Sequence, residues 1–412
     1  MQNNALTIPP LSTDGSGQPR AAAVVEPRPD QRLARRYCFN DADMDLFFMA
    51  ALGWGPTGGL DIGQAFHVAS SITDGDPDSW VQAFSKYGAT LDTQANVWKA
   101  RGWKQQAGEM HLKAFASFRS AWQFALAGES FDSNYAAHKK AFATAMHELE
   151  INAMFFQVPH RNHQLPGVFL NHPRPDAPVL LVIGGADTCF EDLFLTVGRN
   201  VFERGYSVAL VDLPGQGATQ VEGLHWEADA ECAIASVIDM LVARFGATPG
   251  RIALLGLSLG GYFVARAAGR EMGLATVMAS TPFPEPAQLF ALAVRTMEQA
   301  EVFGAPSAAA VRSRLNALWK AGARNAEEFL SRTMNMRADP TRVTVPFLSI
   351  LGTGDSPVFV TQAEMWHNEI RSARKALVRL DAETGADGHV QINGRLRLAQ
   401  ECCGWMAEIF MS

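Results

Sequence analysis

The sequence predicts an α/β protein in which a mostly parallel sheet, with helices on both faces, follows an all-helical domain. Short apolar runs, each ending in turn residues and most separated by helix-like segments, recur over residues 166–412; this pattern is typical of parallel strands buried on both faces. Residues 31–165 instead carry apolar residues three and four positions apart, the spacing of amphipathic helices. A length of 412 residues accommodates two such domains.

The N-terminal part divides in two. Residues 1–30 are rich in proline and show little apolar periodicity, which predicts a mobile tail or an arm that orders on a partner. Residues 31–165 are expected to form a helical domain for substrate binding or dimerisation. Its helices are predicted at Ala95–Phe118, Ser120–Ala127 and Asn134–Phe156.

Seven strands are predicted in the second domain, residues 166–412. They are Phe169–Leu170, Val179–Ile183, Ser207–Val211, Ile252–Leu255, Ala275–Ala279, Phe347–Leu351 and Ala376–Leu380. Residues 283–342 interrupt this rhythm with helical sequence rich in alanine and arginine, just before a late strand. An insertion at this point suits a small lid above an active site.

Composition excludes several classes of protein. Apolar residues make up 48% and charged residues 19% of the chain, as in ordinary soluble domains. The formal charge of −7 argues against nucleic-acid binding. No apolar run is long enough to span a membrane, and the N-terminus lacks the pattern of a signal peptide. Five scattered cysteines do not form a disulfide framework, so we expect buried free thiols and a cytoplasmic location.

The segment Gly256–Gly261 has the sequence G-L-S-L-G-G, with the apolar run Ile252–Leu255 before it and a helix-like segment after it. Strand, sharp turn and helix are the context that gives G-x-S-x-G its meaning. The turn presents the Ser258 hydroxyl above the sheet edge at a helix N-terminus, and the N–H of Leu259 then faces developing negative charge. We therefore expect Ser258 to attack a carbonyl.

A serine hydroxyl needs a base, and the base needs an orienting acid. On sheets of this kind the chain order is serine, acid, histidine. Asp355 follows the strand Phe347–Leu351 and is the expected acid, although its glycine and proline neighbours also favour an Asx turn. Of the two histidines after Ser258, His367 precedes the last strand and His389 follows it. His389 is therefore the expected general base; as a loop histidine without a role it would leave the serine without any base.

The loop Gly184–Thr188 follows an early strand and is the expected source of a second oxyanion-binding N–H, from Gly185 or Ala186. Asp187 is unusual there, because a carboxylate opposes the charge that an oxyanion hole stabilises. Two interpretations remain open. Asp187 either assists proton transfer or substrate binding, or it caps the helix that follows.

Cofactor signals are weak throughout the chain. Gly215-Gln216-Gly217 lacks the third glycine of a dinucleotide site, and no phosphate-binding loop occurs. His160 and His163 have no cysteine or acid nearby in the sequence and are interpreted as exposed linker residues. We expect no cofactor and no metal.

The combination of these motifs resembles a branch of the α/β hydrolases. The branch includes FrsA-like proteins, 2,6-dihydroxypseudooxynicotine hydrolase and the fungal polyketide-shortening hydrolases. The resemblance rests on the G-G-A-D loop, the G-x-S-x-G turn, a helical domain that precedes the core, the segment Asp212–Gly217 (D-L-P-G-Q-G) and the late segment Gly388–Asn393. It covers nearly all of the chain beyond residue 30. It implies an α/β-hydrolase fold and a homodimer with the active site between the core and the helical domain. It also implies a catalytic role for Asp187, which matches a glutamate thought to assist catalysis in the nicotine-pathway relative.

Together, the residues and the resemblance predict a serine hydrolase that cleaves a carbon–carbon bond beside a ketone, or an ester, in a small aromatic or polyketide-like molecule. An acyltransferase with the same residues is the alternative. A regulatory binding protein on a hydrolase scaffold is a third hypothesis, against which the complete set of Ser258, Asp355 and His389 argues. A propeller-bearing peptidase does not fit, because the leading 165 residues are too short and too helical.

Overall fold

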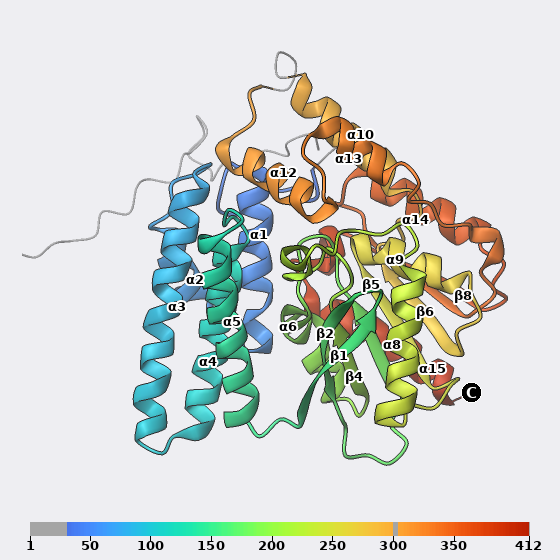
Figure 1. The fold of residues 1–412 in the computed structure, drawn as a ribbon, viewed down its shortest axis with the longest axis horizontal. Helices are drawn as coiled ribbons and strands as arrows, with labels where there is room; N and C mark the ends of the chain where they lie inside the picture. Colours follow the sequence, from blue (N-terminus) through green and yellow to red (C-terminus); the bar gives the residue numbers. More distant parts are fainter. Residues whose placement is uncertain (1–30, 300–303, 412) are drawn as a thin grey trace, which may run out of the picture.

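A computed structural model describes residues 31–299 and 304–411 of the chain. A helical region lies beside an eight-stranded sheet, and further helices cover the sheet (Figure 1). The α/β-hydrolase fold with a preceding helical region is thereby confirmed. The tail or arm predicted for residues 1–30 lies outside the described residues.

The helical region contains five helices. They are α1 (Ala42–Gly53), α2 (Ile62–Ala69), α3 (Pro77–Ala100), α4 (Lys104–Trp122) and α5 (Glu129–Glu148). Local sequence sets their ends: the Asp41 side chain accepts a hydrogen bond from the N–H of Met44 at the start of α1, and Pro77 is the first residue of α3. Gly102, with φ +82°, sits in the break between α3 and α4, which divides the single helix predicted there.

The sheet has the strand order β1-β2-β4-β3-β5-β6-β7-β8. Its strands are β1 (Ala153–His160), β2 (His163–Leu170), β3 (Val179–Ile183), β4 (Ser207–Val211), β5 (Ile252–Leu257), β6 (Leu274–Ser280), β7 (Phe347–Gly352) and β8 (Lys375–Leu380). The β1–β2 and β2–β4 pairs are antiparallel, and the remaining pairs are parallel. All seven predicted strands are present.

Both faces of the sheet are buried, as β3 illustrates. Leu180 and Val182 join a core that also contains Phe115 and Phe142 of the helical region. Leu181 and its alternate neighbours face a second core, formed with helices on the other side. The covering helices are α6 (Phe190–Leu193), α7 (Arg199–Phe202), α8 (Glu231–Phe245), α9 (Leu259–Ala268), α14 (Pro357–Glu369) and α15 (Arg395–Met411). The helical region therefore shares its core with one face of the sheet.

The predicted insertion contains α10 (Pro286–Glu298), α12 (Ala308–Ala321) and α13 (Ala326–Thr333), between β6 and β7. These helices lie across the top of the molecule in Figure 1, above both the helical region and the carboxyl ends of the strands. Arg312 of α12 donates to the carbonyl of Phe124 at 2.6 Å and Asn316 donates to that of Gln123 at 3.1 Å. The insertion is thus hydrogen-bonded to the helical region.

The sheet begins earlier than the sequence suggested. The helix predicted over Asn134–Phe156 ends at Glu148, and β1 starts at Ala153, inside the range 31–165 assigned to the helical domain. Side chains of β1 alternate, with Phe156, Val158 and His160 buried and the residues between them exposed. Apolar residues on both sides of the turn concealed this change from helical to strand periodicity.

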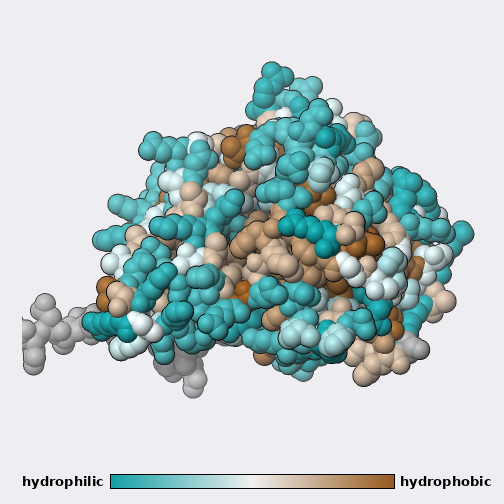
Figure 2. All heavy atoms as spheres, turned by 60° about the horizontal axis from the view of Figure 1, so that its bottom comes forward, coloured by the Kyte–Doolittle hydropathy of each residue, from teal (hydrophilic) through white to brown (hydrophobic). Residues whose placement is uncertain are grey.

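No helix in residues 31–299 or 304–411 is long and apolar enough to cross a membrane. All five cysteines are unpaired; Cys189, Cys402 and Cys403 are buried as expected, whereas Cys38 and Cys232 are exposed. The face opposite the insertion shows apolar side chains near its centre and hydrophilic ones around them (Figure 2).

Candidate active site

Ser258 occupies the tight turn between β5 and α9. Its backbone, at φ 56° and ψ −121°, has a conformation that residues other than glycine rarely adopt. Holding the residue in this conformation costs about 1–3 kcal/mol. The Ser258 N–H donates to the Ser280 carbonyl at 2.8 Å, and the Ser258 carbonyl accepts from the Gly261 N–H at 2.7 Å. Gly260 passes so close to the Gly184 carbonyl that a side chain there would collide with it. The turn is therefore fixed from both sides.

His389 and Asp355 lie beside Ser258. In sequence, His389 is 131 residues from Ser258 and 34 residues from Asp355. His389 Nε2 is 2.8 Å from Ser258 Oγ, and His389 Nδ1 is 2.7 Å from Asp355 Oδ2. Asp355 Oδ1 accepts from the N–H of Ser356 at 2.7 Å, and the Phe359 ring packs on the His389 ring with centroids 4.6 Å apart. The three predicted residues thus form one chain of hydrogen bonds, with the acid and the base both buried.

The loop Gly184–Thr188 reaches the same place. A Cβ on Gly185 would lie 2.7 Å from Ser258 Cβ, so only glycine permits this approach. The fully buried Gln216 donates through Nε2 to the carbonyls of Gly184 at 2.6 Å and Gly185 at 3.0 Å. Gln216 also accepts from the Leu213 N–H at 2.8 Å. The D-L-P-G-Q-G segment therefore anchors this loop, a role that the sequence reasoning did not assign to it.

Three cations from three separate segments converge on Ala186 and Asp187. Lys320 of α12 donates to the Ala186 carbonyl at 2.8 Å and lies 3.3 Å from Asp187 Oδ1. Arg32 contacts Asp187 Oδ2 at 3.3 Å. Arg119 of α4 donates to the Asp187 carbonyl and pairs with Asp192 at 2.6 Å. The insertion, the segment around Arg32 that precedes α1, and the helical region therefore all contact this one loop.

These contacts bear on both interpretations of Asp187. Burial alone would raise the pKa of its carboxyl, but the charges of Lys320 and Arg32 outweigh burial and hold that pKa well below its usual range. The carboxylate is therefore ionised and compensated, which disfavours a resting proton donor. The helix after the loop is capped through Cys189 and Asp192, with no cap contact from Asp187. The observed role of Asp187 is an ion-pair bridge that neither interpretation anticipated.

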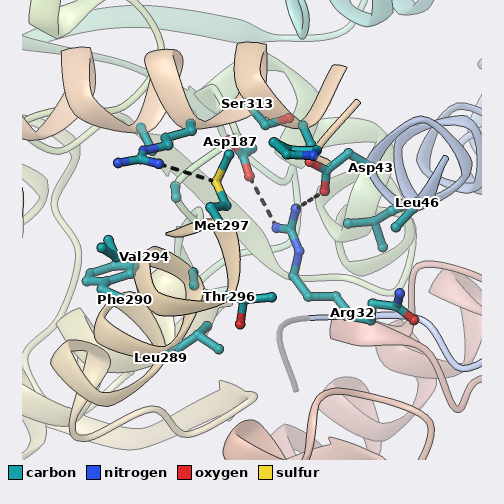
Figure 3. Close-up of a pocket in the computed structure, with 18 of the residues that line it drawn as sticks. Arg32, Asp43, Leu46, Asp187, Leu289, Phe290, Val294, Thr296, Met297 and Ser313 are labelled. Carbon is teal, nitrogen blue, oxygen red and sulfur yellow. Dashed lines mark hydrogen bonds and ion pairs between the residues drawn. The ribbon is translucent and has the colours of Figure 1, made fainter. Parts of the chain in front are cut away.

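A cavity of about 450 Å³ opens beside Ser258. Its walls come from residues 31–46, from Ala186, Asp187 and the Ser258 turn, and from α10, α12 and α13 of the insertion. Figure 3 shows Arg32 between Asp187 and Asp43, with Leu289, Phe290 and Val294 on the opposite side. Within the described chain, α2–α5 contribute no wall residue. The insertion and residues 31–46, which include the start of α1, thus form more of the cavity wall than α2–α5 do.

The Arg32 segment also contacts the candidate base. The Arg32 carbonyl accepts from the His389 N–H at 3.2 Å, and Leu33 packs with Ile392, Leu46 and Ala50. Arg32 escaped sequence reasoning because it follows directly on residues 1–30, for which the sequence pattern predicts only a tail or an arm. Arg119 and Lys320 escaped it because single cations on amphipathic helices are usually solvent-exposed.

One buried group in the described chain has metal-ligand chemistry: His138, Cys189 and Glu191, whose ligand atoms lie within 4.8 Å of one another. Trp122 Nε1 can only donate, and it donates to His138 Nδ1 at 3.1 Å. The neutral ring therefore carries its proton on Nε2, the atom that faces Cys189 and Glu191. Burial also raises the pKa of the Cys189 thiol well above its usual value. The group fits a hydrogen-bonded structural cluster and does not fit a metal site.

His160 also differs from expectation. It is buried in β1, and its Nε2 lies 3.0 Å from Glu227 Oε2. The interpretation of His160 as an exposed linker residue is therefore wrong. Its acidic partner was missed because it is 67 residues away in sequence, whereas sequence reasoning considered only near neighbours.

Comparisons with known proteins identify the family and the fold. Residues 179–398 match the model of the alpha/beta hydrolase family. Hydrolyase poxO of Penicillium oxalicum is 29% identical over 56% of this chain and 58% of its own length. 20-hydroxy-prefusarin hydrolase FUS2 of Gibberella moniliformis is 30% identical over 54% and 56%, respectively. The chain thus spans little more than half the length of these relatives.

Many solved structures are similar to this chain, and two of them illustrate the shared fold. The 2,6-dihydroxy-pseudo-oxynicotine hydrolase superimposes with a TM-score of 0.70 at 18% identity, over 87% of this chain and 95% of that one. AbyA5 superimposes with a TM-score of 0.57 at 16% identity, over 89% and 94%, respectively. The family match includes Ser258, Asp355 and His389 and more than half of all residues. This chain belongs to the alpha/beta hydrolase family.

Proposed function

We propose that the chain is a serine hydrolase that acts on a carbonyl group of a small organic molecule. The observation that carries the proposal is the chain of hydrogen bonds from Ser258 Oγ through His389 to Asp355, 2.8 and 2.7 Å long, at the wall of a cavity. A nucleophile, a base and an orienting acid in this geometry are what acyl transfer from a carbonyl requires.

The first half of the proposed reaction acylates the enzyme. Asp355 accepts from Nδ1–H and fixes the tautomer of His389, so that Nε2 takes the Ser258 proton as Oγ bonds to the carbonyl carbon. The N–H of Leu259 and one from Gly185 or Ala186 hold the oxyanion. The bond between the carbonyl carbon and the leaving carbon or oxygen then breaks as His389 returns the proton to that leaving atom, and the acyl group stays on Ser258.

The second half releases the acyl group. Water enters, His389 takes its proton as the oxygen attacks the acyl carbon, and the Ser258 oxygen leaves with that proton. The paired Asp187 contributes by keeping the loop in place. It does so without adding uncompensated negative charge, because Arg32 and Lys320 balance it.

The proposed substrate carries an ester, or a ketone whose adjacent carbon–carbon bond is cleaved. The names of the relatives, a hydrolyase and a 20-hydroxy-prefusarin hydrolase, support a small organic molecule as the substrate. Acyl transfer to an alcohol or amine is the second candidate, because the helices of the insertion line the cavity beside Ser258 and a walled site favours a bound acceptor over bulk water. A homodimer, a cytoplasmic location and a substrate-binding role for the helical domain remain predictions.

Product analysis on an ester panel tests the proposal. The purified chain is expected to release acid from short aryl esters, and Ser258→Ala is expected to lose nearly all of that turnover while keeping its circular dichroism spectrum. Addition of candidate alcohols or amines separates the two candidates, since a transferase forms the new ester or amide in preference to the acid. Undiminished turnover by the Ser258→Ala variant would contradict both.

A further inference from the structure

One face of α12 lines the cavity beside Ser258. Ala310, Ser313, Arg314, Ala317 and Leu318 share this face at the three- and four-residue spacing of a helix. All but Ser313 and Arg314 are apolar. Arg314 therefore places a positive charge on the cavity side of an otherwise small and apolar surface.

Two other cationic side chains of α12, Arg312 and Lys320, form ion pairs with carboxylates. Arg312 Nη2 lies 3.0 Å from Asp78 Oδ1, and Lys320 Nζ lies 3.3 Å from Asp187 Oδ1. Among residues 31–299 and 304–411, the only hydrogen-bonding partner of Arg314 is the Met297 sulfur, 3.8 Å from its Nη1, and no carboxylate pairs with it. A thioether is a weak acceptor, so a half-buried guanidinium with five donors is left almost unused.

The acids of the cavity are already engaged. Asp187 is held by Arg32 and Lys320, and Asp43 lies 3.5 Å from Arg32. Asp41 caps α1 and accepts from Ser307. The unused charge at the cavity wall is therefore positive, which favours an anionic group on whatever enters.

The facing wall is apolar. Leu289, Phe290 and Val294 of α10 line the cavity together with Phe329 of α13. Phe290 stacks on Trp226 with ring centroids 5.8 Å apart and planes 8° apart, which holds it in place. A ligand that uses both walls has an apolar body and one anionic end.

We propose that the cavity takes a substrate with an apolar body and a carboxylate remote from the reacting carbonyl, and that Arg314 binds this carboxylate through paired hydrogen bonds. A planar guanidinium matches a carboxylate in this way, and such charge-assisted bonds orient a ligand as well as holding it. The assignment of the reacting carbonyl rests on the proposed function, whereas the assignment of the carboxylate site does not.

Kinetics on matched substrates test the proposal. The substrates are p-nitrophenyl half-esters of the linear dicarboxylic acids from succinate to sebacate, each paired with its uncharged methyl ester. We expect kcat/KM to favour the acid over the methyl ester by about 10-fold or more at the best chain length. Arg314→Met is expected to abolish this preference while changing turnover of the methyl ester less than about 2-fold, and Arg314→Lys is expected to restore part of it.

Arg295→Met is the matched control, because Arg295 is exposed on α10 and does not line the cavity. It should leave the preference for the acid intact. Equal losses on both substrates in Arg314→Met, or no preference in the unmodified protein at any chain length, would overturn the assignment.

A binding measurement separates this proposal from the reaction. Calorimetry with the free dicarboxylates uses the Ser258→Ala variant, which cannot turn over. Binding that is lost when Arg314→Met is added supports the carboxylate site even if no ester is cleaved. Unchanged binding in that double variant overturns the site while leaving the proposed reaction standing.

Discussion

Replacement of Lys320 by methionine tests whether the oxyanion loop is held by charge. The change keeps the length and most of the apolar stem of the side chain but removes the ammonium. Two contacts disappear: the 2.8 Å hydrogen bond to the Ala186 carbonyl and the 3.3 Å ion pair with Asp187. Asp187 keeps Arg32, and part of its side chain reaches solvent.

The size of the effect follows from burial and distance. At 3.3 Å the ion pair is worth about 5 kcal/mol before desolvation, with an effective dielectric constant of about 20. Only 3% of Lys320 is exposed, so desolvation of the ammonium offsets much of that attraction. The bond from the ammonium to a carbonyl adds about 1.5–3 kcal/mol. We expect the free energy of unfolding to fall by about 2–4 kcal/mol and kcat to fall because the loop shifts.

A double-mutant cycle in urea isolates the ion pair. Lys320→Met, Asp187→Asn and the double variant are unfolded in parallel, with Lys140→Met as control because Lys140 is exposed and outside the site. The double variant should lose about 1–3 kcal/mol less than the sum of the single variants. Additive losses within about 0.5 kcal/mol would show that Lys320 and Asp187 do not support each other.

Four further changes probe the same site. Since the folded pKa of Asp187 lies below its unfolded value of about 3.9, its ionisation stabilises the fold above about pH 4 and that stability is lost in acid. When the urea concentration at the unfolding midpoint is plotted against pH, Asp187→Asn should therefore reduce its fall below about pH 4. An unchanged fall would argue against the ion pairs. Asp355→Asn should lower kcat by about 10⁴-fold without unfolding the chain, because the wrong tautomer of the base is favoured; a kcat within 10-fold would rule out Asp355 as the orienting acid. Gln216→Leu leaves the buried Gly184 carbonyl without its donor and the Leu213 N–H without its acceptor, whereas the Gly185 carbonyl keeps the Thr188 hydroxyl as a donor. The loss should cost about 2–4 kcal/mol in thermal unfolding together with activity, an effect that a merely space-filling glutamine would not show. Gly185→Ala places a methyl group against Ser258 and should abolish ester turnover at a smaller cost in stability, so retained turnover would place the oxyanion loop elsewhere.

Sequence patterns identified the regular parts of the fold well. Buried parallel strands such as Val179–Ile183 are continuous apolar runs. All seven predicted runs are strands in the sheet, including Phe169–Leu170 of the antiparallel β2. The first strand was missed because Phe155 and Phe156 continue an apolar helical pattern across a short turn. Local periodicity cannot locate a boundary when apolar residues lie on both sides of the junction.

Sequence patterns also identified only part of the candidate site. Ser258, Asp355 and His389 were identifiable because each follows a strand in a fixed chain order, and the structure places them within hydrogen-bonding distance of one another. Arg32 and Lys320 were not identifiable, since 155 and 133 residues separate them from Asp187 and neither has a local motif. Contacts that depend on the docking of whole segments leave little trace in a single sequence.

The most direct test of the central claim is covalent labelling of the nucleophile. A fluorophosphonate is incubated with the protein, and mass spectrometry locates the adduct. The proposed mechanism predicts one adduct, on Ser258, which is absent from Ser258→Ala and forms far more slowly in His389→Ala. No adduct on the unmodified protein, or equal labelling of the Ser258→Ala variant, would contradict the claim that Ser258 is an activated nucleophile.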